Sequence, residues 1–272
     1  VDDESIERLH ERWPFRRRIY ADLVDKLAGS RPRLIAFDLI FAGRGDATDD
    51  FLLGRAIADA GNVVLASYVD QERNYVVARE ELREGARGSG VVNLLEDRDF
   101  SVRRKPLFFR SERGDIAAWT WEAAIARGVS GLDQTEARIL KQRVIFEGAE
   151  KRSLEIPLHG ERWAAINYRL TLEDVASISL WEALERESPA PEVEGKIVLI
   201  GATSRGLHDY YRTPLGLMPG VVVNMNFLAN LLTDDFLFFL PPMANALLFG
   251  LMGGVGWVAG LRFGLGRSLL TV

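Results

Sequence analysis

Leu34-Ile35-Ala36-Phe37-Asp38-Leu39-Ile40-Phe41 is the stretch of sequence that decides the fold. All of its residues except Asp38 are apolar, and it has the length of a strand rather than of a helix. A nearly continuous apolar run of this length is typical of a strand that is buried on both faces, as in a parallel sheet. The run therefore predicts a sheet that is flanked by helices.

The segments around this run alternate between helix and strand patterns. The spacing of apolar residues predicts a helix over residues 18–28, and a glycine-rich turn leads to a second helix over residues 50–60, with Asp49 as its N-cap. Residues 62–68 and 196–201 repeat the pattern of a buried strand. Strands separated by helices indicate an α/β fold with a mainly parallel central sheet, flanking helices and right-handed crossovers.

The rest of the folded part predicts shorter elements. Further helices are expected over residues 3–12, 116–126, 174–187 and 221–232, and a mobile loop over residues 79–90. Shorter strands are expected over residues 91–95, 102–108, 144–146, 154–158 and 164–168. We expect these strands to extend the sheet or to form a side layer.

Composition excludes several classes of protein. The chain has 272 residues, of which 47% are hydrophobic, so it can build one large core or two small ones. Its net charge of −5 argues against a nucleic-acid partner, because such proteins carry a strong basic excess. The absence of cysteine excludes disulfides, thiolate metal sites and thiolate nucleophiles. Neither a P-loop nor a dinucleotide fingerprint occurs, and we expect no cofactor.

The C-terminal part differs sharply from the rest, because residues 236–261 contain no charged side chain. A helix that opens at Pro241-Pro242 has the length of about 20 residues that crosses a hydrocarbon core. Two pairs of glycines have the GxxxG spacing that lets membrane helices pack closely: Gly250 with Gly254, and Gly256 with Gly260. The alternative is a buried core helix, but such helices rarely reach this length without a charge. The pattern predicts a transmembrane helix over residues 237–261.

The flanking charges orient this helix. Asp234 and Asp235 precede it, whereas Arg262 and Arg267 follow it. The positive-inside rule counts the arginines and places the C-terminal end in the cytoplasm. We therefore expect residues 1–236 to form a periplasmic or extracellular domain on the inner (plasma) membrane. Residues 262–272 would be a cytoplasmic turn and the start of a second membrane helix, and a strand and an anchor are expected before Val1.

Polar residues follow the predicted strands where ligands bind in α/β sheets. Asp3, Asp38 and Thr203 are expected to meet at the carboxyl ends of the strands, and Asp209 can approach from the following loop. One hypothesis is a site for a small polar ligand or a divalent cation, with Asp3 and Asp38 as candidate metal ligands. The alternative is structural: the carboxylates of Asp38 and Asp209 cap helices or brace arginines such as Arg17.

Two other groups of residues suggest weaker hypotheses. Trp13 lies within a basic cluster that includes Arg17, which fits an anion site or simply a solvated start of a helix. His208 beside Asp209 invites a hydrolytic interpretation, yet no nucleophile elbow accompanies the pair. The aromatic side chains of Trp119 and Trp121 are expected in the core and at its rim, with a ligand stack as the alternative.

Several ordered blocks of the chain resemble the second type of CHASE domain, a sensory domain of bacterial cyclases and sensor kinases. The blocks are Asp2-Asp3 with residues 12–17, residues 35–41, Asp49-Asp50, residues 61–66, Asn93 through residues 103–107, residues 195–203, Asp209, residues 213–216, residues 218–221 and Asn226. Arg16, Val222 and Asn224 depart from the residues common in the family, where a proline, an acidic residue and a histidine are expected. Two of these departures fall on the predicted helix over residues 221–232.

The resemblance implies a sensory domain without enzymatic activity of its own. In that family the domain is followed by three membrane helices and a cytoplasmic output domain, usually a class III adenylate or guanylate cyclase, and otherwise a histidine or Ser/Thr kinase or a diguanylate cyclase. Asn224 completes the candidate ligand residues, and Val221, Asn226 and Leu232 are candidates for relaying the signal. Such outputs work as dimers, so we expect a homodimer. The alternatives are a membrane-anchored periplasmic hydrolase and a structural dimerisation module.

Overall fold

The computed structural model describes residues 1–111, 113–132, 136–148, 153–186, 191–240 and 242–262. The chain divides into one unit over Val1–Leu237 and a second over Phe238–Val272, and each unit has a structure of its own. The first unit is a mixed α/β fold with several small sheets around one larger sheet.

The larger sheet has five strands and is mixed. Its strand order is β12 (Ile197–Ile200), β1 (Leu34–Phe37), β2 (Val63–Val69) and β3 (Tyr75–Val76), with β4 (Gly88–Val91) also on β2. The pairs β1–β12, β1–β2 and β2–β4 are parallel, whereas β3 runs antiparallel to the end of β2. The predicted deciding stretch thus forms β1, which has a neighbour on each side.

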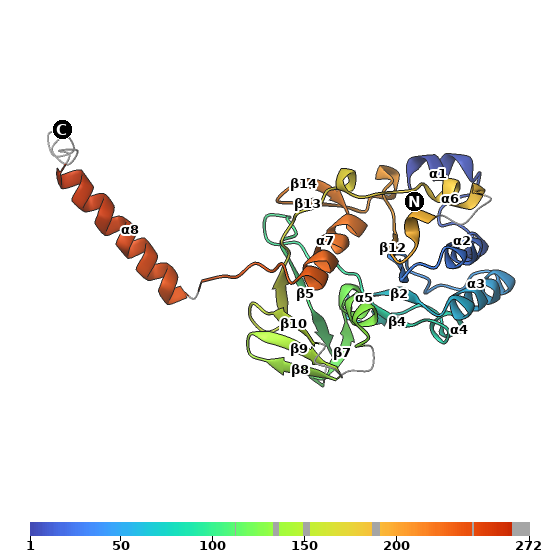
Figure 1. The fold of residues 1–272 in the computed structure, drawn as a ribbon, viewed down its shortest axis with the longest axis horizontal. Helices are drawn as coiled ribbons and strands as arrows, with labels where there is room; N and C mark the ends of the chain where they lie inside the picture. Colours follow the sequence, from blue (N-terminus) through green and yellow to red (C-terminus); the bar gives the residue numbers. More distant parts are fainter. Residues whose placement is uncertain (112, 133–135, 149–152, 187–190, 241, 263–272) are drawn as a thin grey trace. The chain divides into compact units, whose positions relative to one another are not determined.

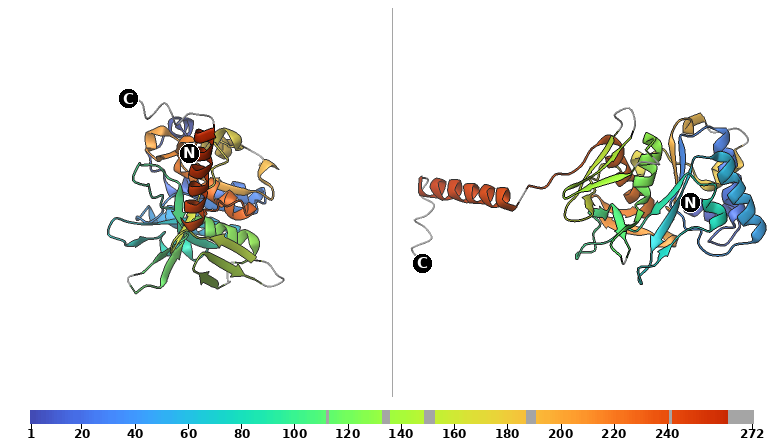
Figure 2. Two further views of the ribbon diagram at one scale, coloured as in Figure 1. Left: turned by 90° about the vertical axis from the view of Figure 1, so that its left-hand side faces the viewer. Right: turned by 90° about the horizontal axis from the view of Figure 1, so that it is seen from below.

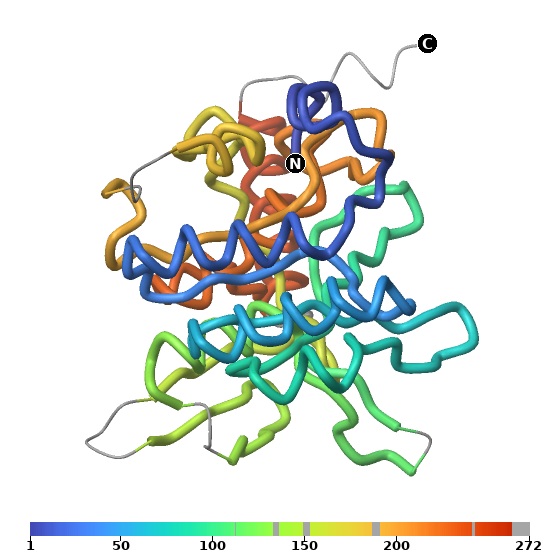
Figure 3. Tube along the Cα trace, turned by 90° about the vertical axis from the view of Figure 1, so that its right-hand side faces the viewer, coloured from blue at the N-terminus to red at the C-terminus, as the bar shows by residue number. Residues whose placement is uncertain are grey.

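Alternate residues of the strands face two separate cores, because side chains point to opposite faces along a strand. Ile35 and Phe37 of β1 pack with α2 (Arg17–Gly29), α3 (Ala47–Ala60) and α4 (Glu80–Arg83). Leu34 and Ala36 pack with α5 (Trp121–Ser130) and α7 (Gly220–Thr233). The sheet is therefore covered on both faces, and Figure 3 shows α2 and α3 lying side by side on one of them.

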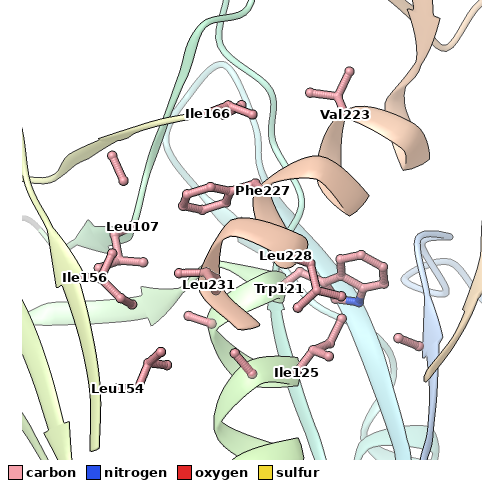
Figure 4. Packing of buried hydrophobic residues seen from close by; sticks show 14 of the residues in the cluster. Leu107, Trp121, Ile125, Leu154, Ile156, Ile166, Val223, Phe227, Leu228 and Leu231 are labelled. Atoms are coloured by element: carbon pink, nitrogen blue, oxygen red, sulfur yellow. The ribbon is translucent and has the colours of Figure 1, made fainter. Parts of the chain in front are cut away.

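The core around α5 and α7 is closed by short strands that form sheets of their own (Figures 1 and 2). Two of these sheets have two strands each: β5 (Arg104–Pro106) pairs with β11 (Trp163–Ala165), and β6 (Phe108–Arg110) pairs with β7 (Ile116–Trp119). The third has three strands, β8 (Ala137–Leu140), β9 (Arg143–Glu147) and β10 (Ser153–Pro157). In Figure 4, Leu107 and Ile156 from this layer lie toward Phe227 and Leu231 of α7. These strands form a side layer and do not extend the larger sheet.

Shorter pieces complete the first unit. They are α1 (Asp3–Arg8), α6 (Leu180–Glu185), the hairpin of β13 (Tyr210–Thr213) and β14 (Gly216–Pro219), and the 3₁₀ turns η2 (Leu172–Asp174), η3 (Pro191–Val193) and η4 (Arg205–Leu207). The tryptophans behave as expected: Trp121 is fully buried, and Trp119 lies edge-on to Phe108 and Phe146 with ring centroids 5.5 and 4.9 Å apart.

The predicted mobile loop over residues 79–90 is wrong, because this segment contains α4 and most of β4. Its glycines are points of close packing. A Cβ atom at Gly85 would lie 2.6 Å from Cβ of Ala58, and one at Gly90 would lie 2.5 Å from Cα of Trp121. Glycine is needed at these positions for close approach of the backbone, so its presence did not signal flexibility.

Four predicted helices have different bounds. The helix expected over residues 3–12 is the short α1, which ends at Arg8. The segment 116–126 begins as β7, and α5 starts only after Thr120, whose side chain accepts a hydrogen bond from the Ala123 N–H. The segment predicted as a helix over 174–187 holds the end of η2 and the short α6, because Thr171 and Asp174 form a capping box around a single turn. Asp46 caps α3, and Asp49 lies inside that helix.

The second unit contains α8 (Pro242–Arg262). Met243–Arg262 has a mean hydropathy of 1.5, and none of its apolar window is buried within the protein. The 21 residues of α8 give a length of about 31 Å, which matches a hydrocarbon core. A helix this apolar and this exposed is suited to lipid rather than to a soluble core. The predicted start of a second membrane helix falls on residues 263–272, outside the described residues.

Candidate functional site

A small polar pocket of about 190 Å³ lies where the strands of the larger sheet end. It is lined by Asp38, Tyr68, Val92, Asn93, Leu94, Asp209, Tyr211, Gly220 and Asn224. Asp38 directly follows β1, Tyr68 is the second-last residue of β2, and Val92 directly follows β4. The pocket therefore occupies the carboxyl ends of parallel strands, where open α/β sheets bind ligands.

Asp38 is held by backbone and side-chain hydrogen bonds. Its N–H donates to the Ile200 carbonyl over 2.7 Å, which continues the β1–β12 ladder by one step. Its Oδ2 accepts a hydrogen bond of 3.0 Å from Nδ2 of Asn224. Burial, followed by the charge of Asp209, raises the pKa of Asp38 to about 7 against the opposing effect of Lys105. Asp38 therefore changes its charge near neutral pH.

Asp209 faces the same pocket from the other side. Burial raises the pKa of its carboxyl, and the hydrogen bond with Tyr211 opposes this shift. The pKa of Tyr211 is raised to about 12, mainly by burial and then by Asp209. The carboxylate lies against the first turn of α7, because a Cβ at Gly220 would come within 2.6 Å of its Oδ2. Negative charge is favoured at the N-terminus of a helix, and no side chain caps α7.

A buried ion pair lies beneath the pocket. Lys105 of β5 and Glu122 of α5 are both fully buried, and Nζ lies 2.6 Å from Oε1. Nζ also donates to Oδ1 of Asn224 over 2.7 Å and to the carbonyl of Val92 over 3.2 Å, so all three of its N–H groups are used. Burial raises the pKa of Glu122, and the charge of Lys105 opposes that shift.

Asn224 joins the ion pair to the pocket. Its amide accepts from Lys105 and donates to Asp38, so a continuous chain of hydrogen bonds runs from Glu122 to Asp38. Its members come from β5, α5, α7 and the end of β1. A change in charge at Asp38 therefore acts directly on α7, the helix that carries Asn224.

Asn93 forms part of the pocket wall. Its Oδ1 accepts from the Val69 N–H over 2.7 Å, and its Nδ2 donates to the Val69 carbonyl over 2.8 Å. The amide thus continues the β2–β4 ladder with a side chain, in the way that asparagine commonly imitates backbone. Its carbonyl oxygen and one of its two N–H groups are engaged in this role.

Asp3 and Thr203 do not line the pocket. Oδ1 of Asp3 accepts a hydrogen bond from Oγ of Ser204, and the N–H of Thr203 donates to the carbonyl of Val1 over 2.8 Å. Together with the bond of 2.7 Å from the Val1 amino group to the Gly201 carbonyl, these contacts tie the first residues to the end of β12. Within the described residues, no group of three or more His, Asp or Glu side chains is placed to hold a metal ion.

Trp13 and Arg17 also lie away from the pocket. Trp13 packs edge-on against Phe15, with ring centroids 5.4 Å apart. The buried guanidinium of Arg17 pairs with Asp50 and donates to the carbonyls of Phe41 and Gly43. Asp50, rather than Asp38 or Asp209, is thus the carboxylate that braces Arg17, and the basic cluster holds α2 against α3.

Comparison with known families agrees with the ordered blocks of the sequence. The sequence profile described as the CHASE2 domain matches residues 1–259. The chain belongs to the CHASE2 family. This confirms the resemblance drawn from the sequence, and CHASE2 is a family of extracellular sensory domains rather than of catalytic ones. Comparison with curated proteins and with solved structures gave no match.

In this CHASE2 chain, α7 is fastened to an extended segment by two buried asparagines. Asn226 accepts from the N–H groups of Arg169 and Leu170 and donates to the Leu170 carbonyl, each over 2.9 Å. Asn230 accepts from the N–H of Asn167 over 2.8 Å and donates to its carbonyl over 2.9 Å. The two amides act as substitute strand partners for residues 167–170, and we call this arrangement the asparagine clamp.

The other two predicted relay residues differ in their surroundings. Val221 packs against the end of β12 so closely that a Cβ at Gly201 would lie 2.6 Å from it. Leu232 is exposed near the end of α7. Beyond α7, Asp235 accepts from Nδ2 of Asn167 over 2.9 Å and pairs with Arg169. The clamp is therefore extended by a charged contact just before the second unit.

Sequence reasoning missed Lys105, Glu122, Asn93, Tyr68 and Tyr211. One of these carried a usable signal, because Glu122 is the only charge within Trp-Glu-Ala-Ala-Ile-Ala, whereas Lys105 belongs to a basic run after Arg103 and Arg104. A lone charge in such an apolar setting indicates a buried group that needs a partner. The identity of that partner depends on the fold.

Proposed function

We propose that this chain is the extracytoplasmic sensory domain of a bacterial transmembrane receptor, with the polar pocket as its ligand site. The observation that carries the proposal is that one helix, α7, both lines the pocket and leads along the chain to the apolar helix α8. The first two turns of α7 line the pocket through Gly220 and Asn224, and α7 is followed along the chain by the membrane-compatible α8.

The proposed signal is a change in how α7 is held. A ligand that contacts Asp38 or Asp209 alters the charges that act on Asn224 and on the first turn of the helix. A ligand shifts a two-state equilibrium only by its difference in affinity for the two states, and a complete switch needs about 5.5 kcal/mol. The asparagine clamp makes α7 move together with residues 167–170, so the displacement is passed on toward Asp235 and α8.

The output we propose is a class III adenylate or guanylate cyclase in the cytoplasm, working as a homodimer at the inner membrane with the sensory domain in the periplasm. Membership of the family supports a sensory role, and the apolar α8 supports anchoring. Histidine or Ser/Thr kinase and diguanylate cyclase outputs are the alternatives. Each would receive the same movement of α7.

The hydrolase alternative gains no support from the arrangement of His208 and Asp209. Asp209 faces the pocket, whereas His208 is exposed, has a φ of 56° and does not line the pocket. A general base must lie within hydrogen-bond reach of the proton that it removes. His208 lies outside the pocket that Asp209 faces, so the two side chains do not serve one common site. A purely structural module differs from a sensor in having no ligand response, which the binding measurements below address.

Labelling of single cysteines in intact cells tests the proposed location. Because the chain has no cysteine, Glu173→Cys adds a single thiol on the exposed surface of the sensory domain. A membrane-impermeant maleimide should modify E173C in intact cells, in a receptor whose remaining parts lack cysteine. The matched variant Arg262→Cys, at the end of α8, should react only after lysis. Equal protection of both positions would overturn the proposal.

A further inference from the structure

We propose that the pocket binds a small organic cation through a primary ammonium group. The inference rests on the proposed sensory function and deepens it by naming the class of ligand. It follows from which polar groups of the lining are already occupied, which are still available, and what charge they leave uncompensated.

Much of the donor capacity of the lining is used by the protein itself. Nδ2 of Asn93 donates to the Val69 carbonyl, and Nδ2 of Asn224 donates to Asp38. Beneath them, the three N–H groups of Lys105 are taken by Glu122, Asn224 and Val92. Each asparagine amide keeps one further N–H, but an anion would also have to lie beside the two carboxylates of the lining, which repel it.

The groups with remaining capacity are mainly acceptors. Asp38 uses Oδ2 for Asn224, and a carboxylate has about four acceptor positions in all. Asp209, which also accepts a hydrogen bond from Tyr211, adds further acceptor positions, and the hydroxyls of Tyr68 and Tyr211 can accept as well as donate. An ammonium group offers three donors and a positive charge, and therefore satisfies two carboxylates and a hydroxyl at once.

The charges of the site point the same way. Glu122 and Lys105 neutralise each other, and among the described residues that line the pocket Asp38 and Asp209 have no Lys, Arg or His beside them. Two negative charges repel each other strongly where little water screens them. A ligand with a positive charge between them removes that repulsion, as does a proton, so protons and the ligand compete.

The size of the pocket favours an organic cation over a bare metal ion. A volume of about 190 Å³ has room for several water molecules. An ammonium group with a short chain fills this space. The two aspartates would leave water to supply most of the six or more oxygen ligands of a divalent cation, and the described residues hold no group of three His, Asp or Glu side chains placed for a metal ion.

Thermal unfolding of the purified full chain in detergent tests the inference. The probes are methylamine, ethanolamine and putrescine at pH 8, with ethylene glycol and 1,4-butanediol as neutral counterparts of similar shape. At least one amine should raise the unfolding temperature in a saturable manner, at a concentration at least tenfold below that of its diol. Asp38→Asn and Asp209→Asn should each weaken this binding at least tenfold, whereas the exposed Glu161→Gln should not change it.

Three results would overturn the inference. They are no response to any of the amines, equal responses to an amine and its diol, or an amine response that survives both D38N and D209N. A response to Mg²⁺ or Ca²⁺ that depends on Asp38, without a response to amines, would assign the pocket to a metal ion instead. If D38N fails to fold, the D209N variant and the comparison of amines with diols still show whether the pocket binds an ammonium group. Failure here leaves the cysteine labelling unaffected, so the two proposals fail separately.

Discussion

At the scale of single residues, the native state depends strongly on the buried ion pair of Lys105 and Glu122. Lys105→Met would leave Glu122 buried without its partner, and we expect a loss of about 3–5 kcal/mol in the free energy of unfolding. Chemical denaturation in detergent measures this change. The double variant K105M/E122L should recover most of the loss, because both charges are then absent.

An exposed ion pair provides the control for this prediction. Arg143 and Glu155 lie 2.6 Å apart with about half of each side chain exposed, so Arg143→Met should have little effect on unfolding. If K105M were as stable as R143M, the chain of hydrogen bonds from Glu122 to Asp38 would not contribute to the native state.

Asp38 gives the protein a specific dependence on pH. The native state keeps the Asp38 proton up to about pH 7, whereas the unfolded chain releases it near the ordinary value of 3.8. The native state therefore binds more protons between these values, and this residue's contribution to stability falls as pH rises through the window. The groups that face Asp38 are Asp209, Lys105, Asn224 and Glu122.

Asp38→Asn removes this titration, so its stability relative to the wild-type chain should increase from pH 4 to pH 7 and then level off. Unfolding temperatures of both proteins across pH 4–8 measure the difference. A constant difference across this range would contradict a raised pKa at Asp38.

Part of the candidate site is predictable from single residues. Asp38, Asp209 and Asn224 were expected from strand ends and family blocks, and the structure brings them together around one pocket. Asp3, Trp13, Arg17 and Thr203 lie elsewhere, because each has a partner that the sequence does not reveal, such as Ser204 for Asp3. Spacing along the chain identifies strand ends but cannot say which side chains are already bonded.

At the scale of elements, the asparagine clamp determines how α7 is held. Asn226→Ala would remove the partners of two backbone N–H groups and one carbonyl in residues 169–170, and we expect a loss of about 2–4 kcal/mol. Hydrogen exchange should show faster exchange at Arg169 and Leu170. The exposed Leu232→Ala, on the same helix, should leave both exchange and stability nearly unchanged.

The elements that the sequence predicted well are those with a dominant periodic pattern. β1, β2, α3 and α7 bury nearly continuous or helically spaced apolar residues, so propensity and packing agree. The segment 79–90 was predicted wrongly because charge and glycine suggest a loop. There, contacts of Gly85 and Gly90 with distant helices decide the structure, and such contacts are not visible in a local pattern.

At the scale of the whole molecule, the composition of the first unit suits water, whereas the apolar α8 of the second unit suits a lipid bilayer. Leu251 lies in the middle of α8 and is exposed, so Leu251→Arg should weaken membrane insertion by about 2.5–3.5 kcal/mol if α8 spans the bilayer. Extraction by alkaline carbonate measures the fraction retained in membranes. The control Leu217→Arg, on the exposed hairpin, should not change that fraction. Equal extraction of both variants would contradict a spanning α8.

The close fit at Gly220 gives a purely steric means of disturbing the sensor. An alanine there adds one methyl group and alters neither charge nor hydrogen-bonding groups, yet its Cβ would lie 2.6 Å from Oδ2 of Asp209. Either the carboxylate or the first turn of α7 would have to move, so the wall of the pocket is disturbed without a ligand. The response of a receptor to this single methyl group would separate the effect of crowding from that of electrostatics.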